Sequence, residues 1–277
     1  MNGTERTTRK TCEKIQKIQR RDGPAMIYAL ANQKGGVGKS TSALNLAAAM
    51  VHLIPPGGRV LLVDLDPQCN VTFAAAGEQE FARNVYRLLL DRAPVEEYVV
   101  ASRIYGVDLI PSHIDLAGAE VELASEIGAQ TLLATKLARA RLPHHHIILD
   151  CPPALGLIVV NALAAADRVL VPVAPGIFAL RGLAKLTDTI DQVRERLSRP
   201  VQLGGIFLTM VDRTNVSRDT RALLESSFPG KVLETAIPRA VKVEEAHSRH
   251  ESIATYAPDS PAAAAYMQLA KEVLRRG

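Results

Sequence analysis

The stretch Lys34-Gly35-Gly36-Val37-Gly38-Lys39-Ser40-Thr41 decides the fold. An apolar run, residues 26–31, precedes it, and an alanine-rich helical stretch, residues 39–53, follows it. Glycines lack a Cβ atom, so backbone N–H groups can wrap a phosphate at the N-terminus of the following helix. The pattern predicts a strand, a phosphate-binding loop and a helix, with Lys39 reaching the phosphates and Ser40 binding Mg²⁺. The alternative interpretation is a glycine-rich turn that only precedes a helix.

The loop departs from the plain motif G-x-x-x-x-G-K-[ST], because Gln33 occupies the first glycine position. What remains is K-G-G-x-G-K-[ST], the deviant Walker A form, which resembles the ParA/MinD group of P-loop ATPases. The resemblance implies that residues 34–41 bind ATP. It also implies that Lys34 crosses the interface of an ATP-dependent homodimer and contacts the phosphates held by the partner subunit.

Two apolar runs, residues 61–63 and 147–149, lead into aspartates. Carboxylates at the C-terminal edge of a parallel sheet point into the crevice where ligands bind. Because side chains alternate along a strand, we expect only one of Asp64 and Asp66 to face the nucleotide. The resemblance implies that Asp66 orients the attacking water, that Asp64 supports the Mg²⁺ shell and that Asp150 holds Mg²⁺. For each aspartate taken alone, a helix or turn cap is the alternative. Cys69 stands where the family usually has glycine.

From residue 26 onward, short apolar runs alternate with longer helical stretches, a pattern typical of βα units. Expected strands span residues 26–31, 59–64, 107–110, 146–150, 168–173, 203–211 and 231–235. Expected helices span residues 39–53, 82–90, 129–141, 156–165, 179–197, 217–227 and 261–275. The sequence therefore predicts an α/β fold, a mostly parallel twisted sheet flanked by helices, with one P-loop ATPase domain over residues 26–277.

The positive charge of the chain belongs to its first residues. Residues 1–21 hold seven basic and two acidic side chains, whereas the remainder holds 26 basic and 27 acidic ones. Residues 1–25 are therefore predicted to form a basic N-terminal arm, either a solvated tail or a contact for nucleic-acid phosphates. A further interpretation is that the protein starts at Met26.

Cysteine usage and hydropathy indicate a cytoplasmic protein without membrane attachment. Cys12, Cys69 and Cys151 are too few for a disulfide framework, and no Cys-x-x-Cys pair suggests zinc or an iron–sulfur cluster. No apolar run approaches the roughly 20 residues of a membrane span, and residues 261–277 are typical of a helix docked on the core. We interpret the histidines at 144–146 as an exposed edge entering a strand, and Cys151 as a small core residue.

Similarity to the Soj-like branch of the family extends over nearly the whole chain from residue 26. It rests on residues 61–68, 114–123, 178–183, 237–239, 244–248 and 256–260. In this family, dimers bind duplex DNA without sequence preference through basic residues near the C-terminal edge of the fold. The resemblance points to Arg213, Arg218, Arg239 and Lys242, with Arg221 and Arg249 as further candidates. An ordinary solvated basic face is the alternative. The resemblance also implies that Met210 and Pro238 line the adenine base.

The expected function is that of a DNA-partitioning ATPase that acts at the nucleoid. ATP and Mg²⁺ close the dimer on nonspecific duplex DNA, and a ParB-like activator releases it by stimulating hydrolysis. One alternative is a ParA-like ATPase that positions a protein cargo. Another is a MinD-like regulator that works as a nucleotide switch and hardly hydrolyses ATP.

Overall fold

The computed structural model describes residues 25–176 and 180–276. Their centre is a seven-stranded sheet in the order β3-β4-β2-β5-β1-β6-β7. The strands are β1 Met26–Leu30, β2 Val60–Asp64, β3 Val100–Ala101, β4 Val107–Ile110, β5 His146–Asp150, β6 Arg168–Val173 and β7 Gln202–Leu208. All neighbouring strands run parallel except β3, which runs antiparallel to β4 at one edge. The predicted α/β fold with a mostly parallel sheet is confirmed.

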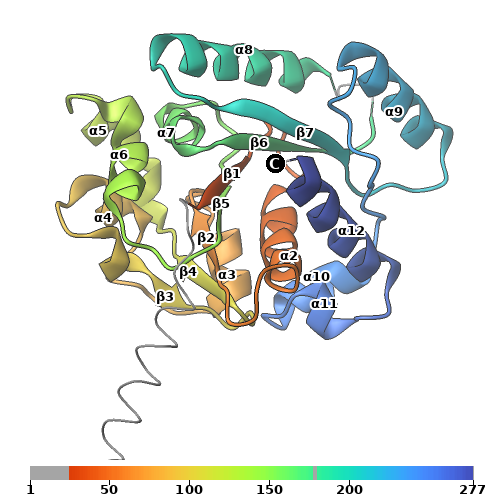
Figure 1. The fold of residues 1–277 in the computed structure, drawn as a ribbon, viewed down its shortest axis with the longest axis horizontal. Coiled ribbons are helices and arrows are strands. Elements are labelled where there is room, and N and C mark those ends of the chain that lie inside the picture. Colours follow the sequence, from red (N-terminus) through yellow and green to blue (C-terminus); the bar gives the residue numbers. More distant parts are fainter. Residues whose placement is uncertain (1–24, 177–179, 277) are drawn as a thin grey trace, which may run out of the picture.

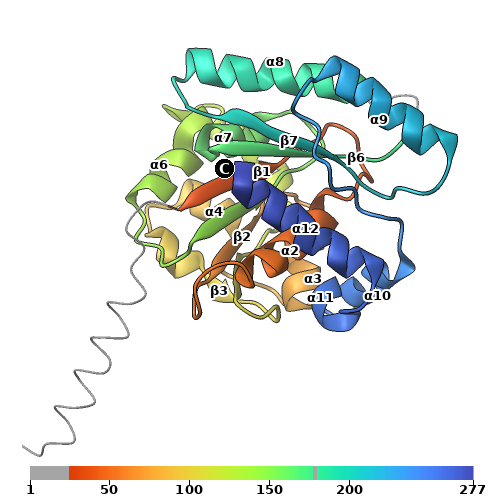
Figure 2. The ribbon, with the colours of Figure 1, turned by 45° about the vertical axis from the view of Figure 1, so that its right-hand side comes forward.

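Helices cover both faces of the sheet (Figure 1). One layer contains α4 Val85–Leu90, α5 Ala119–Leu123, α6 Leu132–Arg139, α7 Leu157–Ala165 and α8 Arg181–Arg196. The other contains α2 Lys39–Val51, α3 Asn70–Ala76, α10 Val241–Ser248, α11 Ile253–Tyr256 and α12 Pro261–Arg276. The helix α9 Asn215–Ser227 lies beyond the β7 edge, and α12 packs along α2 (Figure 2). The strands are therefore buried on both sides, which explains their continuous apolar runs.

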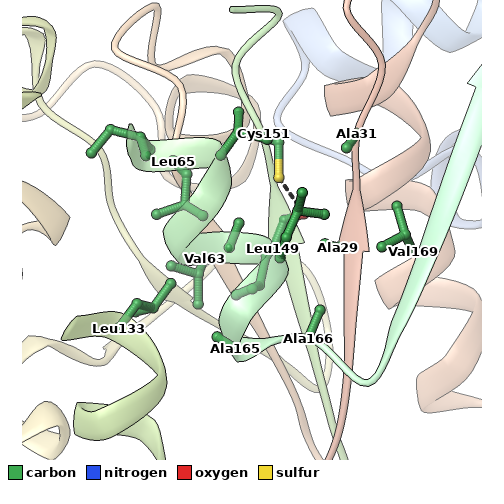
Figure 3. Close-up of a cluster of buried hydrophobic side chains, with 14 of the residues drawn as sticks. Ala29, Ala31, Val63, Leu65, Leu133, Leu149, Cys151, Ala165, Ala166 and Val169 are labelled. Carbon is green, nitrogen blue, oxygen red and sulfur yellow. Dashed lines mark hydrogen bonds between the residues drawn. The ribbon is translucent and has the colours of Figure 1, made fainter. Parts of the chain in front are cut away.

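Side-chain alternation along the strands divides the interior into two cores. In β1, Ala29 packs into the core beneath α7, whereas Tyr28 and Leu30 pack into the core beneath α2. Figure 3 shows part of the first core, where Cys151 lies beside Leu149. Cys151 is fully buried, and its thiol points at the Leu149 carbonyl oxygen at 4.0 Å. The interpretation of Cys151 as a small core residue is confirmed.

The predicted strand at residues 231–235 was wrong. This segment forms only an isolated parallel bridge, between Ile206 and Val232. The reason lies in α12, where the buried carboxylate of Glu272 accepts the backbone N–H groups of Glu234 at 2.8 Å and Thr235 at 3.0 Å. Those two groups are therefore not available for a strand ladder.

Several short elements were not predicted from the sequence, namely β3, α3, α5, α10 and α11. Each spans eight residues or fewer, which is too short to show a period clearly. The helix expected at residues 129–141 begins as a 3₁₀ turn, Ala129–Thr131, before α6. Of the predicted arm at residues 1–25, only Ala25 lies within the described residues, so the arm and the single domain stay predictions. No helix in the described part of the chain is long and apolar enough to cross a membrane.

His144 is not an exposed edge residue, which corrects part of the interpretation of residues 144–146. Its side chain is buried, and its Nε2 lies 2.8 Å from the Asp108 carboxylate. Arg59 binds the same carboxylate through two nitrogens, each at 2.5 Å. Burial acts to raise the pKa of Asp108, but the bonds from His144 and Arg59 outweigh it and bring the pKa down to about 2.

Replacing Asp108 by asparagine is expected to lower the free energy of unfolding by about 2 kcal/mol at pH 7. The folded-state pKa of Asp108 lies below its ordinary 3.8, so the carboxylate stabilises the fold above that pH. The difference from the wild type should shrink as the pH falls from 4 toward 2. Urea unfolding at pH 7 and at pH 3 measures it. Asp188→Asn, at an exposed position on α8, is the control, and an equal loss in both variants would contradict the argument.

Candidate active site

The glycine-rich stretch forms an open loop between the end of β1 and the start of α2. Gly36 and Gly38 have φ values of 69° and 78°, which glycine adopts without strain. Among the described residues, no side chain caps the N-terminus of α2, and its first turn holds no acidic residue. The leading N–H groups of this 13-residue helix therefore have no side-chain partner, and this end of the helix suits an anion.

Two residues outside the motif hold the loop in place. The Asn32 side chain accepts the Lys34 N–H at 2.9 Å and donates to the Pro172 carbonyl at 2.7 Å. The Thr209 hydroxyl, from the end of β7, donates to the Val37 carbonyl at 2.9 Å. Sequence reasoning missed both, because neither belongs to a local pattern and Thr209 is 172 positions away along the chain.

The two lysines of the loop differ in burial. Lys39 is 6% exposed, and its Nζ donates to the Lys34 carbonyl at 3.2 Å. Burial lowers the pKa of Lys39, while Asp150 and Asp66 act in the opposite direction. Lys34 is exposed to solvent, with its Nζ near Gly176. Lys39 therefore faces inward to the acidic strand ends, whereas Lys34 is available to a second molecule.

The three predicted carboxylates lie near one another, and two of them, Asp150 and Asp66, act on Lys39. Asp64 and Asp150 are paired across the neighbouring strands β2 and β5, and both are fully buried. Asp66 is 6% exposed, and its N–H donates to the Asp64 carboxylate at 3.1 Å. The expectation that only one of Asp64 and Asp66 faces the nucleotide stays a prediction. Both oxygens of Asp64 accept hydrogen bonds from within the fold, whereas Asp66 acts on Lys39.

The two buried carboxylates have different surroundings. Asp64 accepts the N–H of Thr72 at 2.8 Å and its hydroxyl at 2.7 Å, so it fixes the first turn of α3. Neither oxygen of Asp150 has a hydrogen-bond partner of good geometry among the described residues. Burial raises the pKa of Asp64 to about 6. Burial, followed by the nearby Asp64, raises the pKa of Asp150 well above its ordinary value, and the neighbouring Ser40 hydroxyl lowers it in part.

An unpartnered buried carboxylate beside a hydroxyl fits a hard divalent cation. Asp150 and Ser40 supply those groups, whereas the oxygens of Asp64 are already bonded. In the described residues, no three His, Cys, Asp or Glu side chains gather closely enough to bind a metal by themselves. Magnesium suits such a site, since it keeps several waters and takes further ligands from phosphates. The support of Asp64 for the Mg²⁺ shell stays a prediction, and its contacts favour an indirect part.

Cys69 lies on the loop that follows Asp66. It has φ 56°, immediately before α3, and its thiol donates to the Pro67 carbonyl at 3.4 Å. The Asp66 carboxylate accepts the Gln68 N–H at 3.0 Å, so the loop backbone orients it. A non-glycine residue costs about 1–2 kcal/mol in the left-handed region. The loop thus keeps the conformation that suits glycine even though this chain has cysteine.

The residues predicted to line the base lie beside the loop. A Cβ atom placed on Gly38 would be 3.7 Å from Met210 Cε, and Met210 itself has φ 51°. The next residue, Val211, forms a parallel bridge with Pro238. Met210 therefore lies against the loop and Pro238 lies beside the residue that follows Met210, while their contact with a base stays a prediction.

The predicted DNA-binding residues are exposed but do not form one cluster. Arg213 and Arg239 lie on adjacent segments, because the Arg239 N–H donates to the Val211 carbonyl at 3.0 Å. Arg218 belongs to α9 and Lys242 to α10, and these helices lie apart in both ribbon views. Arg221 donates to the Leu233 and Glu234 carbonyls at 3.4 and 3.0 Å, so its guanidinium joins α9 to that segment.

Comparison with known proteins is consistent with this geometry. The family described as AAA domain matches residues 25–203. The chromosome-partitioning ATPase Soj of Thermus thermophilus is 46% identical over 249 residues, which cover 90% of this chain and 95% of that protein. The sporulation initiation inhibitor protein Soj of Bacillus subtilis is 41% identical over 253 residues, covering 91% and 99%.

A solved structure shares both the fold and part of the sequence. It is described as cobyrinic acid a,c-diamide synthase from Mycobacterium smegmatis, with a bound ATP analogue and magnesium. The TM-score is 0.78 at 34% identity, and the match covers 91% of this chain and 95% of that one. Together with the loop of residues 34–41 and its acidic strand ends, these similarities show that the chain belongs to the ParA/Soj family of partitioning ATPases.

Proposed function

We propose that this protein is a Mg²⁺-dependent partitioning ATPase whose ATP-bound homodimer binds duplex DNA without sequence preference. The observation that carries the ATPase part is the buried, unpartnered carboxylate of Asp150 beside the open N-terminus of α2. A buried carboxylate without a partner is costly, and a bound cation would offset that cost. Relatives that are named chromosome-partitioning ATPases support the partitioning part.

Each loop residue then has a role in binding the triphosphate. Backbone N–H groups of residues 35–41, together with Lys39, bind the phosphates, and Met210 and Pro238 line the base. Ser40 and Asp150 hold the cation, which would neutralise charge on the phosphate oxygens. Asp66 orients the attacking water as a general base. Asp64 acts on this site through α3, because it binds Thr72.

The exposed position of Lys34 supports a dimer closed by nucleotide. Lys39 already faces the carboxylates of its own subunit, whereas Lys34 points to solvent. A cation from a second subunit would add charge-assisted hydrogen bonds to phosphates that one subunit neutralises only in part. Dimerisation would then depend on ATP.

We propose that the DNA-binding surface of the dimer includes Arg213, Arg218, Arg239 and Lys242. All four are exposed in the monomer, and two subunits would double the number of phosphate contacts. A ParB-like activator would release the dimer by stimulating hydrolysis. The protein would then act in the cytoplasm at the nucleoid.

Binding to random-sequence duplex DNA tests this proposal. We expect binding with ATP but not with ADP or without nucleotide, and a steep loss between 50 and 200 mM salt. For about six phosphate contacts, that loss is on the order of 10³-fold. Arg213→Ala with Arg239→Ala should weaken binding about tenfold, whereas Lys185→Ala, on the exposed face of α8, should not. Fluorescence anisotropy measures all three proteins.

The absence of DNA binding in every nucleotide state would exclude the DNA part of the proposal. Positioning of a protein cargo, or a nucleotide switch, would then be the better interpretation. Steady-state ATP turnover separates those two, because only the switch functions without appreciable hydrolysis.

A further inference from the structure

A hollow of about 750 Å³ lies beside α6. Its walls are the segment after α4, residues 92–96, and one side of α6 with the residues just before it. The chain leaves α6 toward His146, the first residue of β5, whereas Asp150 is the last residue of that strand. None of the residues that line the hollow belongs to the nucleotide site or to the predicted DNA-binding residues.

Three cations line this hollow, namely Arg92, Lys136 and Arg139. Neither arginine forms an ion pair or a hydrogen bond with another described residue. Lys136 is partly buried and donates to the Asp91 carbonyl at 2.5 Å. Burial, and to a smaller degree Arg139, lower the pKa of Lys136 against the effect of Asp91. Asp91 therefore compensates part of the charge of Lys136, whereas neither arginine has an ion-pair partner among the described residues.

The hollow contains one acidic side chain, Glu96, which is already engaged. Its Oε1 accepts the Arg141 N–H at 2.5 Å. The Glu96 carboxylate therefore lies against the backbone that follows α6. An anion entering the hollow would thus meet three cations and one carboxylate, which keeps its negative charge while it accepts that N–H.

The remaining walls are largely apolar. Leu132 and Ala140 are partly buried wall residues, whereas Pro94 is exposed and the Ile127 side chain is fully exposed. A fully exposed isoleucine beside an apolar wall gains free energy when a ligand covers it. Volumes of 300–1,000 Å³ with apolar walls and a few converging polar groups are typical of small-molecule sites.

We propose that this hollow binds a small amphipathic anion, whose apolar body lies against Ile127 and Leu132 and whose carboxylate or phosphate lies between Arg92, Lys136 and Arg139. Guanidinium groups bind such oxyanions with charge-assisted, often bidentate hydrogen bonds. The apolar wall selects against small inorganic anions. The site is independent of the proposed partitioning function.

Titration calorimetry of the full chain with octanoate tests the site, with 1-octanol as the uncharged counterpart. We expect saturable binding of octanoate and at least about tenfold weaker binding of 1-octanol. The double variant Arg92→Glu/Arg139→Glu should lose at least about tenfold in octanoate affinity. Ile127→Ser should weaken octanoate and 1-octanol alike, because it changes only the apolar contact.

A matched control reverses two charges elsewhere, Lys185→Glu on α8 with Lys271→Glu on α12, both exposed. It should bind octanoate as the wild type does, which separates the hollow from a general effect of net charge. Thermal unfolding and basal ATP turnover should be unchanged in both double variants. The proposal is overturned if the wild type shows no saturable binding below the micellar range, or if both double variants lose affinity equally.

Discussion

Replacing Asp66 by alanine is expected to lower steady-state ATP turnover about 10²–10³-fold and to leave ATP affinity within about threefold. The Asp66 carboxylate is 6% exposed, beside Lys39, and the Gln68 N–H fixes one of its oxygens. A carboxylate oriented in this way can take a proton from water, whereas the phosphates depend on the loop and Lys39. Phosphate release at saturating ATP and binding of a fluorescent ATP analogue measure the two quantities.

Two further variants sharpen this result. Asp66→Asn keeps the shape and one hydrogen-bond acceptor, so it should lose as much turnover as alanine if proton transfer is the role. Retention of most of the activity by asparagine would instead indicate that Asp66 only orients the loop. Asp64→Ala should be distinguishable from both, because it frees the Thr72 N–H at the start of α3 and should lower the unfolding temperature. Wild-type turnover in Asp66→Ala would overturn the assignment.

Replacing Lys34 by alanine is expected to abolish the ATP-dependent dimer and to lower turnover by about 10²-fold or more. The subunit should still bind ATP, because Lys39 and the backbone of the loop remain. Sedimentation velocity with and without ATP measures the dimer, best in the Asp66→Ala background, where ATP should persist. DNA binding should disappear together with the dimer.

The control for this experiment is Lys185→Ala, which removes an exposed lysine from α8. It should dimerise as the wild type does. Lys34→Ala that still dimerises with ATP would show that other groups close the interface. Loss of ATP binding itself in Lys34→Ala would place this lysine at the phosphates of its own subunit, which contradicts the proposed role.

The site could be predicted from the sequence wherever one short segment contains both the functional side chains and the residues that set the backbone conformation. Residues 34–41 are an instance, because their glycines and lysines are contiguous and the flanking strand and helix are long. The acidic strand ends could also be predicted, because Asp64 and Asp150 each follow an apolar run. The two runs form the neighbouring strands β2 and β5.

Contacts between distant segments could not be predicted in this way. The burial of His144 against Asp108 and the bonding of residues 234–235 to Glu272 depend on side chains that meet only after folding. The hollow beside α6 likewise needs two segments that lie more than 30 residues apart along the chain. The periodicity of apolar residues within one segment does not predict which residues of another segment it contacts.

The two margins of the sheet have a consequence for how this protein associates. At one margin, the edge strand β3 has only two residues. At the other, Val232 bridges β7 and Pro238 bridges the segment that follows β7. Between these two bridges, the Glu272 carboxylate accepts the backbone N–H groups of residues 234 and 235. Within residues 25–176 and 180–276, neither margin offers a long row of open backbone groups for strand addition by another molecule. Edge-to-edge aggregation is therefore suppressed. The proposed association and separation with each nucleotide cycle would then proceed at high local concentration without competition from irreversible aggregation.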